Sequence, residues 1–116
     1  MLTIYHNPRC SKSRQTLALI EEKNQPVTIV EYLKTPLNTA EISQLMTLLN
    51  VSPRDMMRTK EAEFKEQNSA NADDATLIAA MATTPKLIER PIVTDNTRAI
   101  IGRPPENVLS LIQVND

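Results

Sequence analysis

Cys10 is the only cysteine of the chain, and it lies in the stretch "HNPRCSKSR" among the cations Arg9, Lys12 and Arg14. A helix is predicted to begin at Ser11, which would put the thiol at a helix N-terminus, where free N–H groups and the helix dipole favour negative charge. Such a position can lower a cysteine pKa from about 8.5 to roughly 3.5–7.5. The pattern therefore predicts a nucleophilic thiolate, and the same donors could hold an oxyanion beside it.

Ser13 completes a C-x-x-S pattern with Cys10 and could donate a hydrogen bond to the sulfur. Because the chain has no second cysteine, a covalently modified Cys10 must be released by an outside thiol, such as glutathione or another protein. The alternative is that Cys10 is a small buried hydrophobic residue, as many free cysteines are. The charged neighbours that follow Asn7-Pro8 favour a partly exposed, reactive thiol instead.

The elements that must position this thiol can be predicted from β-branched runs, apolar spacing and capping residues. We expect strands at residues 2–5, 26–33, 91–94 and 97–101, the last two flanking a turn at Asp95-Asn96. We expect helices at residues 11–24, 38–49, 52–58, 74–84 and 103–113, and a short helix that runs into a mobile loop within residues 60–73. The order β-α-β, then several helices, then β-β-α predicts a single α/β domain over residues 1–116. Its fold class would be a thioredoxin-like mixed sheet with a helical insertion between the two halves.

The composition of the 116 residues excludes several classes of function. Thirteen basic and 14 acidic residues give a net charge of -1, which offers no attraction to nucleic acid or to anionic membranes. One histidine and one cysteine are too few for the usual zinc site, so we expect no metal. The sequence shows no apolar run long enough to cross a bilayer and no signal peptide pattern, and its single cysteine fits a reducing compartment. A cytoplasmic location is therefore expected.

Four segments of the chain, in order, resemble those of the glutaredoxin-coupled arsenate reductase family. They are "YHNPRCSKSR" around Cys10, "MMRTKE" around Arg58, "LIERPIV" around Arg90 and "GRPPE" around Arg103. The resemblance covers nearly the whole chain and implies a thioredoxin-like fold. It is to a short member, since the sequence ends at Asp116 whereas the longer arsenate-detoxifying members carry an extra C-terminal segment.

The resemblance also implies roles for individual residues. Cys10 corresponds to the nucleophile, and Arg58, Arg90 and Arg103 correspond to the arginines that surround the oxyanion. A guanidinium group suits this task because its planar fork binds tetrahedral oxyanions bidentately and stays charged at any working pH. Taken singly, each arginine could instead be a surface residue, and Arg58 could complement the C-terminal end of a helix.

Three further residues are predicted to support the thiolate. His6 and Ser13 occupy family positions with that role, and Arg14 adds a positive charge nearby. In thioredoxin-like folds a cis proline faces the active cysteine, so we predict that the Arg90–Pro91 peptide bond is cis. Only about 5–6% of X-Pro bonds are cis, which makes this prediction informative.

The implied activity is reduction of arsenate to arsenite through a cysteine–arsenate intermediate on Cys10. Glutathione would be the co-substrate, glutaredoxin the protein partner, and no cofactor would be bound. One alternative is a monothiol redox or glutathione-linked enzyme of the same fold, which would not need the three arginines. Another is a redox regulator that binds RNA polymerase; such relatives carry a C-x-x-C pair, and Ser13 occupies its second position here.

Overall fold

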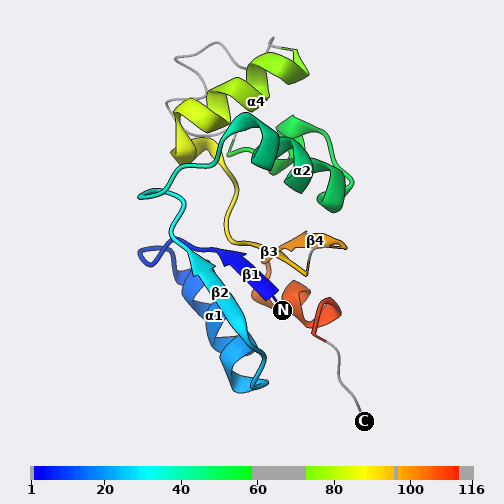
Figure 1. The fold of residues 1–116 in the computed structure, drawn as a ribbon. Coiled ribbons are helices and arrows are strands. Elements are labelled where there is room, and N and C mark those ends of the chain that lie inside the picture. The colour runs from blue at the N-terminus through cyan, green and yellow to red at the C-terminus, as the bar shows by residue number, and fades with distance from the viewer. Residues whose placement is uncertain (1, 59–72, 96, 113–116) are drawn as a thin grey trace. The chain divides into compact units, whose positions relative to one another are not determined.

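The computed structural model describes residues 2–58, 73–95 and 97–112 (Figure 1). The chain divides into two compact units. A sheet unit consists of Met1–Tyr32 with Arg90–Asp116, and a helical unit consists of Leu33–Glu89. The expected single domain over residues 1–116 stays a prediction. None of the helices within the described ranges is long and apolar enough to cross a membrane.

The sheet unit contains four strands and the helix that follows the first of them. These elements are β1 (Leu2–Tyr5), α1 (Ser11–Glu22), β2 (Val27–Val30), β3 (Ile92–Thr94) and β4 (Ala99–Ile101). The strand order is β2-β1-β3-β4, with β2 parallel to β1 and the other two pairs antiparallel. This arrangement confirms the predicted mixed sheet, in which a β-α-β start and a β-β-α finish share strands.

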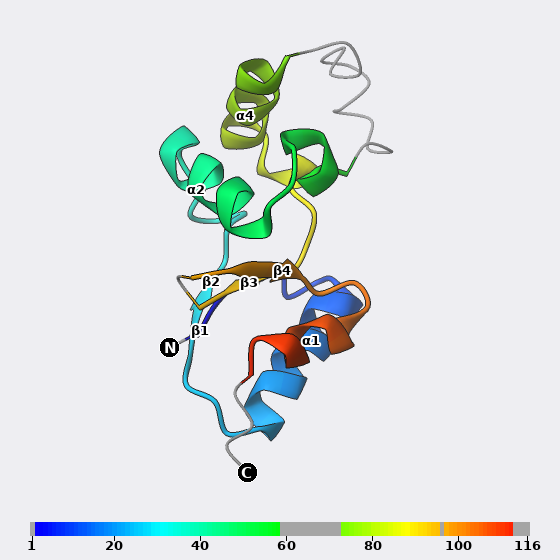
Figure 2. The same ribbon diagram turned by 90° about the vertical axis from the view of Figure 1, so that its right-hand side faces the viewer.

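One face of the sheet is covered by α1 and by the short 3₁₀ helix η4 (Pro105–Ser110), which pack against each other (Figure 2). Their apolar side chains and those of β1 and β3 form a single core. Its buried members are Leu2, Ile4, Ile20, Val93, Val108, Leu111 and Ile112. The core therefore holds α1, and with it Cys10 at its start, firmly against the sheet.

Three of the four predicted strands were too long. The second strand ends at Val30 rather than at residue 33, because β1 provides only four residues for it to pair with. The amide of His6 donates to the Val30 carbonyl (2.8 Å), and the ladder stops there. In the β3–β4 hairpin the Asp95 amide donates to the Arg98 carbonyl (3.2 Å), so β4 begins at Ala99 rather than at residue 97. Strand β3 ends at Thr94 as predicted and begins at Ile92 rather than at residue 91.

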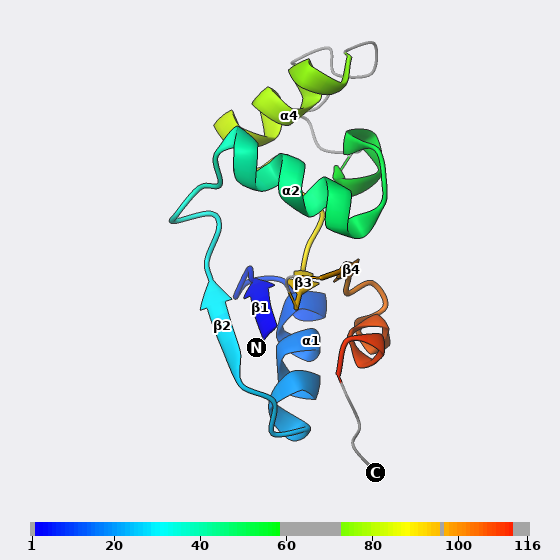
Figure 3. The same ribbon diagram turned by 45° about the vertical axis from the view of Figure 1, so that its right-hand side comes forward.

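The helical unit contains α2 (Thr39–Leu49), η1 (Pro53–Met56), α4 (Asp74–Thr83) and η3 (Pro85–Leu87). Helices α2 and α4 pack against each other within this unit (Figure 3). The predicted capping box is present at the start of α2, where the Asn38 side chain accepts from the N3 amide while the N3 glutamate accepts from the Asn38 amide. The capping box placed the start of α2 correctly, and the aspartate N-cap did the same for α4.

The short helix predicted for residues 52–58 ends earlier, at Met56. Met57 is extended and forms an antiparallel bridge with Ile88. The amide of Arg58 donates to the Leu87 carbonyl (2.7 Å), so pairing with a distant segment replaces the last helical turn. The short helix and loop predicted for residues 60–73 lie outside the described residues, apart from Asp73, which is the N-cap of α4.

Candidate active site

Three strand ends meet at one edge of the sheet. Tyr5 of β1 is opposite Ile92 of β3, which is in turn opposite Ile101 of β4. Because β3 runs antiparallel to both neighbours, the chain leaves β1, enters β3 and leaves β4 at this edge. Cys10 comes shortly after β1, and Arg90 comes shortly before β3. The topology therefore brings sequence-distant segments together at the start of α1.

Two of the three candidate arginines adjoin the same backbone hydrogen bond. The Gly102 amide donates to the Pro91 carbonyl (2.8 Å) and extends the β3–β4 ladder by one residue. Arg90 immediately precedes this pair, and Arg103 immediately follows it. The Arg90–Pro91 bond is cis, which confirms the prediction, and the Arg103–Pro104 bond is cis as well.

Cys10 is the N-cap residue of α1, as the sequence predicts. Its amide donates to the Asn7 carbonyl (3.0 Å), and its own carbonyl accepts the first helical bond, from the Arg14 amide (3.0 Å). The residue is only 9% exposed, so the thiol is less accessible than its charged neighbours suggest. Among those neighbours, Arg9 and Lys12 are exposed, whereas Cys10 is buried.

The electrostatic surroundings of Cys10 favour the thiolate. Burial raises the pKa of the thiol, but this effect is outweighed by the Ser13 amide, the positive charge of Arg90 and the Lys12 amide, so that the pKa is lowered. The sulfur accepts no capping hydrogen bond of ordinary geometry, and the Ser13 and Lys12 amides contribute to the lowered pKa through weaker hydrogen bonds. The side-chain donors of Arg90 add to the effect of its charge on the pKa of the thiol.

His6 and Ser13 form a buried polar pair next to Cys10. His6 Nδ1 lies 2.7 Å from Ser13 Oγ, which also accepts a hydrogen bond from the Asn7 amide (3.0 Å). The Ser13 hydroxyl is therefore engaged with His6 and the Asn7 amide, and it is the Ser13 amide, not the expected hydroxyl, that lowers the pKa of Cys10. Burial lowers the pKa of His6, and Glu31 opposes this shift only in part, so the environment favours the neutral imidazole.

The side chains of Arg9, Lys12 and Arg14 were predicted to favour the thiolate, but none of them is among the groups that lower the pKa of Cys10. Arg14 Nη1 donates to the Pro8 carbonyl (2.9 Å), which ties the loop before Cys10 to the first turn of α1. The amide of Arg9 donates to Asn7 Oδ1 (3.0 Å), while its side chain is exposed. The cation that acts on the thiol is Arg90, which is distant in the sequence.

The three candidate oxyanion ligands belong to both units. In the sheet unit Arg90 is half-buried with two buried nitrogens, Nε and Nη1, whereas Arg103 is exposed. Arg58 is half-buried in the helical unit, where its backbone is fixed by the bond to Leu87. The structure brings Cys10 and Arg90 together and places Arg103 on the same sheet edge. The role of each arginine stays a prediction.

One residue of this region was not identified by sequence reasoning. Gly102 is buried, and a Cβ atom on it would lie 2.6 Å from Thr16 Oγ1 and 2.9 Å from Pro91 Cγ. Real Cβ atoms essentially never come so close to other heavy atoms, so no other residue fits without a shift. The available signal was that Gly102 is the only glycine of the chain.

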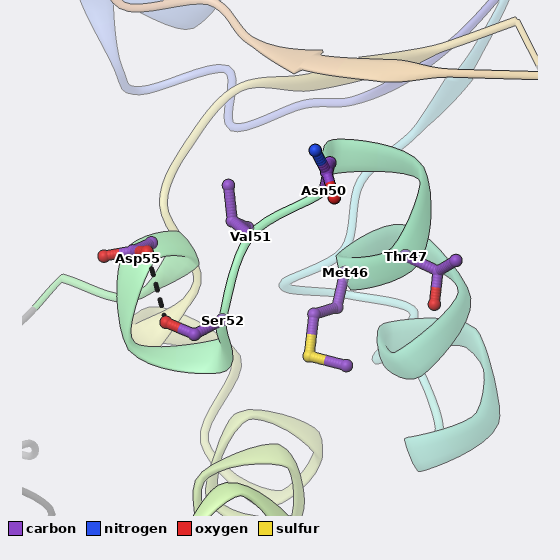
Figure 4. Close-up of a pocket in the computed structure, with 6 residues that line it drawn as sticks. All are labelled: Met46, Thr47, Asn50, Val51, Ser52 and Asp55. Carbon is purple, nitrogen blue, oxygen red and sulfur yellow. Dashed lines mark hydrogen bonds between the residues drawn. The ribbon is translucent and has the colours of Figure 1, made fainter.

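A cavity of about 340 Å³ lies entirely within the helical unit (Figure 4). Its lining residues come from the end of α2 and the start of η1: Met46, Thr47, Asn50, Val51, Ser52 and Asp55. Ser52 Oγ donates to Asp55 Oδ2 (3.1 Å) across one side of it. None of the candidate site residues lines this cavity. Among the described residues, no three His, Cys, Asp or Glu side chains gather in a way that could hold a metal ion.

Comparison with known proteins adds independent information. The model of the ArsC family matches residues 5–111. The uncharacterized protein YfgD of Escherichia coli K12 is 49% identical over 112 residues, 94% of each chain. An arsenate reductase of Neisseria meningitidis serogroup A is 42% identical over 114 residues, 96% of this chain and 97% of that protein. The solved structure of an arsenate reductase from Vibrio cholerae superimposes with a TM-score of 0.93 at 47% identity, covering 96% and 97% of the two chains.

Proposed function

Because the chain belongs to the ArsC family, we propose that it is an arsenate reductase that uses glutathione and glutaredoxin. The observation that carries the proposal is the thiol of Cys10 at the N-cap of α1, with its pKa lowered against the effect of burial by two backbone amides and by Arg90. A thiolate stabilised by the positive charge of a guanidinium group is equipped to attack an anionic, electrophilic centre.

The proposed substrate fits the sheet edge chemically. Arsenate is a tetrahedral oxyanion, and charge builds on its oxygens as sulfur attacks arsenic. We assign Arg90, Arg103 and Arg58 to these oxygens, the first two from the end of the β3–β4 hairpin. The thiolate is kept in place by the first turn of α1, and His6 and Ser13 hold the loop that leads to it.

The reaction would proceed in three balanced steps. The Cys10 thiolate attacks arsenic, and one arsenate oxygen leaves as water, which gives a pentavalent adduct. The thiol of glutathione then joins the adduct and displaces a second oxygen as water. A glutaredoxin thiolate attacks the glutathione sulfur; the arsenic–sulfur electron pair passes to arsenic, which becomes trivalent, and hydrolysis of the remaining bond releases arsenite and free Cys10. Two electrons thus come from two external thiols, consistent with the single cysteine of the chain.

A reconstituted assay tests this function. The purified chain, incubated with arsenate, glutathione and a dithiol glutaredoxin kept reduced by NADPH and glutathione reductase, should produce arsenite, measured by chromatography with arsenic detection. Omission of either glutathione or glutaredoxin should reduce the rate to the background without enzyme. The proposal would be contradicted if thioredoxin supported arsenite formation equally well, or if the complete mixture formed no arsenite.

Because the thiols of glutathione and glutaredoxin are kept reduced in the cytoplasm, we propose that location for the protein.

A further inference from the structure

A buried contact joins the helix that carries the nucleophile to the hairpin end that carries two arginines. Thr16 is fully buried on α1, fewer than two helical turns after Cys10. Its Oγ1 donates to the Lys12 carbonyl (2.8 Å) and lies 3.4 Å from the Gly102 carbonyl. The shorter bond, within the helix, already satisfies the hydroxyl proton. The 3.4 Å contact between Thr16 Oγ1 and the Gly102 carbonyl is therefore mainly a packing contact and contributes little as a hydrogen bond.

The distance between the two segments is set by the absence of a side chain on Gly102. A Cβ there would lie 2.6 Å from Thr16 Oγ1, 3.0 Å from Thr16 Cγ2 and 2.9 Å from Pro91 Cγ. Gly102 does not have a positive φ, so its backbone conformation is open to any residue. The glycine is required because the backbone of the hairpin end lies directly on Thr16 and Pro91.

We propose that Thr16 and Gly102 are positioning residues, which fix the hairpin end carrying Arg90 and Arg103 at a set distance from the helix start carrying Cys10. The inference rests on the proposed function for its substrate. Its geometry is independent of that function. Arg90 precedes Pro91, Arg103 follows Gly102, and the Gly102–Pro91 hydrogen bond makes the two segments move as one. A shift of Gly102 away from α1 would therefore move both guanidinium groups relative to the sulfur.

Three variants test the spacing. Gly102→Ala should raise the KM for arsenate and lower kcat/KM by about tenfold to a hundredfold, since a displacement of roughly 1 Å can have an effect of that size. Thr16→Ala should raise KM by a smaller factor, because it leaves the hairpin end less firmly supported. The double variant should recover much of the loss of Gly102→Ala, since two of its three short contacts are made by Thr16.

Thr83→Ala is the matched control. Thr83 Oγ1 makes the same kind of bond within α4, to the Ala79 carbonyl (3.0 Å), but Thr83 is exposed and lies in the helical unit. This variant should keep the KM of the unmodified chain. If Gly102→Ala does not fold, as judged by circular dichroism, the comparison of Thr16→Ala with Thr83→Ala decides. Equal KM values for those two would overturn the inference.

A readout without turnover separates this inference from the proposed function. Iodoacetamide alkylation reports Cys10 alone, because the chain has one cysteine. Arsenate without glutathione should protect Cys10 from alkylation, and the concentration for half protection should rise about tenfold or more in Gly102→Ala. Half protection that is unchanged in Gly102→Ala and Thr16→Ala would refute the positioning role. A chain that shows the expected shifts in protection but forms no arsenite would refute the reductase proposal and retain the positioning role.

Discussion

Replacement of Cys10 by serine should abolish arsenite formation in the complete assay, with a loss of at least about a thousandfold. A serine hydroxyl is almost fully protonated at neutral pH, and neither Arg90 nor the amides of α1 lower its pKa enough to change that. It also cannot form the sulfur–arsenic bond from which glutathione and glutaredoxin transfer electrons. The rate of arsenite release, measured at saturating arsenate and glutathione, checks this result.

The same variant provides its own control for folding. Serine is among the preferred N-cap residues, because its hydroxyl accepts a hydrogen bond from the first-turn amides that the sulfur does not accept with ordinary geometry. Cys10→Ser should therefore unfold in urea at the same or a higher midpoint than the unmodified chain. A stable variant with more than a tenth of the original turnover would show that another group is the nucleophile.

Replacement of Arg90 by glutamine should reduce arsenate turnover by about a hundredfold to a thousandfold, the usual effect of removing one donor from an oxyanion site. Arg90 is expected to act twice, once on the thiol and once on the substrate. Arg90→Lys should recover part of the first effect, since it restores the positive charge, but little of the second, since lysine lacks the planar fork. Steady-state kinetics of both variants measure these losses.

The pH dependence of alkylation isolates the effect of Arg90 on the thiol. Arg90 lowers the pKa of Cys10, so the alkylation rate of the native chain should rise with pH through an inflection below that of the urea-unfolded chain. Arg90→Gln should move the inflection to higher pH. By linkage, the native thiolate adds stability that is complete above the pKa of the unfolded chain and is lost as the pH falls through the native pKa. The variant should lose the part of this stability that Arg90 supplies and keep the part that the Ser13 and Lys12 amides supply.

Arg9→Gln is the matched control for Arg90→Gln. It removes the same charge beside Cys10 in the sequence, but the Arg9 side chain is exposed. Both the alkylation inflection and arsenate turnover should stay close to those of the unmodified chain. The pair also separates a reductase from a general monothiol enzyme of the same fold, because thiol–disulfide exchange loses only the effect of Arg90 on the thiol, whereas arsenate turnover also loses an oxyanion ligand. Loss of both activities to the same extent in Arg90→Gln would contradict its assignment to the oxyanion.

The parts of the fold that the sequence predicts correctly are those fixed by local interactions. The capping box at Asn38 and the N-cap at Asp73 each satisfy backbone donors within one turn, so a few residues determine where a helix starts. Boundaries that depend on a distant partner were predicted less well. The strand at Val27–Val30 is only as long as β1 allows, and the helix at Pro53–Met56 stops where pairing with Ile88 begins.

The candidate site shows the same division. The position of Cys10 at the start of α1 follows from its neighbours in the sequence. The cation that acts on the thiol is Arg90, and sheet topology alone brings it there. The hydroxyl of Ser13 is taken up by His6 and the Asn7 amide, and this use depends on the folded loop. Periodicity and capping describe elements, whereas contacts between elements need the assembled sheet.

The central claim is that the Cys10 sulfur bonds directly to arsenic, and intact-protein mass spectrometry tests it most directly. Incubation with arsenate alone should add one arsenate minus one water to the chain, with the added mass on the peptide that contains Cys10. Subsequent addition of glutathione should increase the mass by one glutathione minus one further water. An unchanged mass in both incubations, or an addition that persists in Cys10→Ser, would contradict the account.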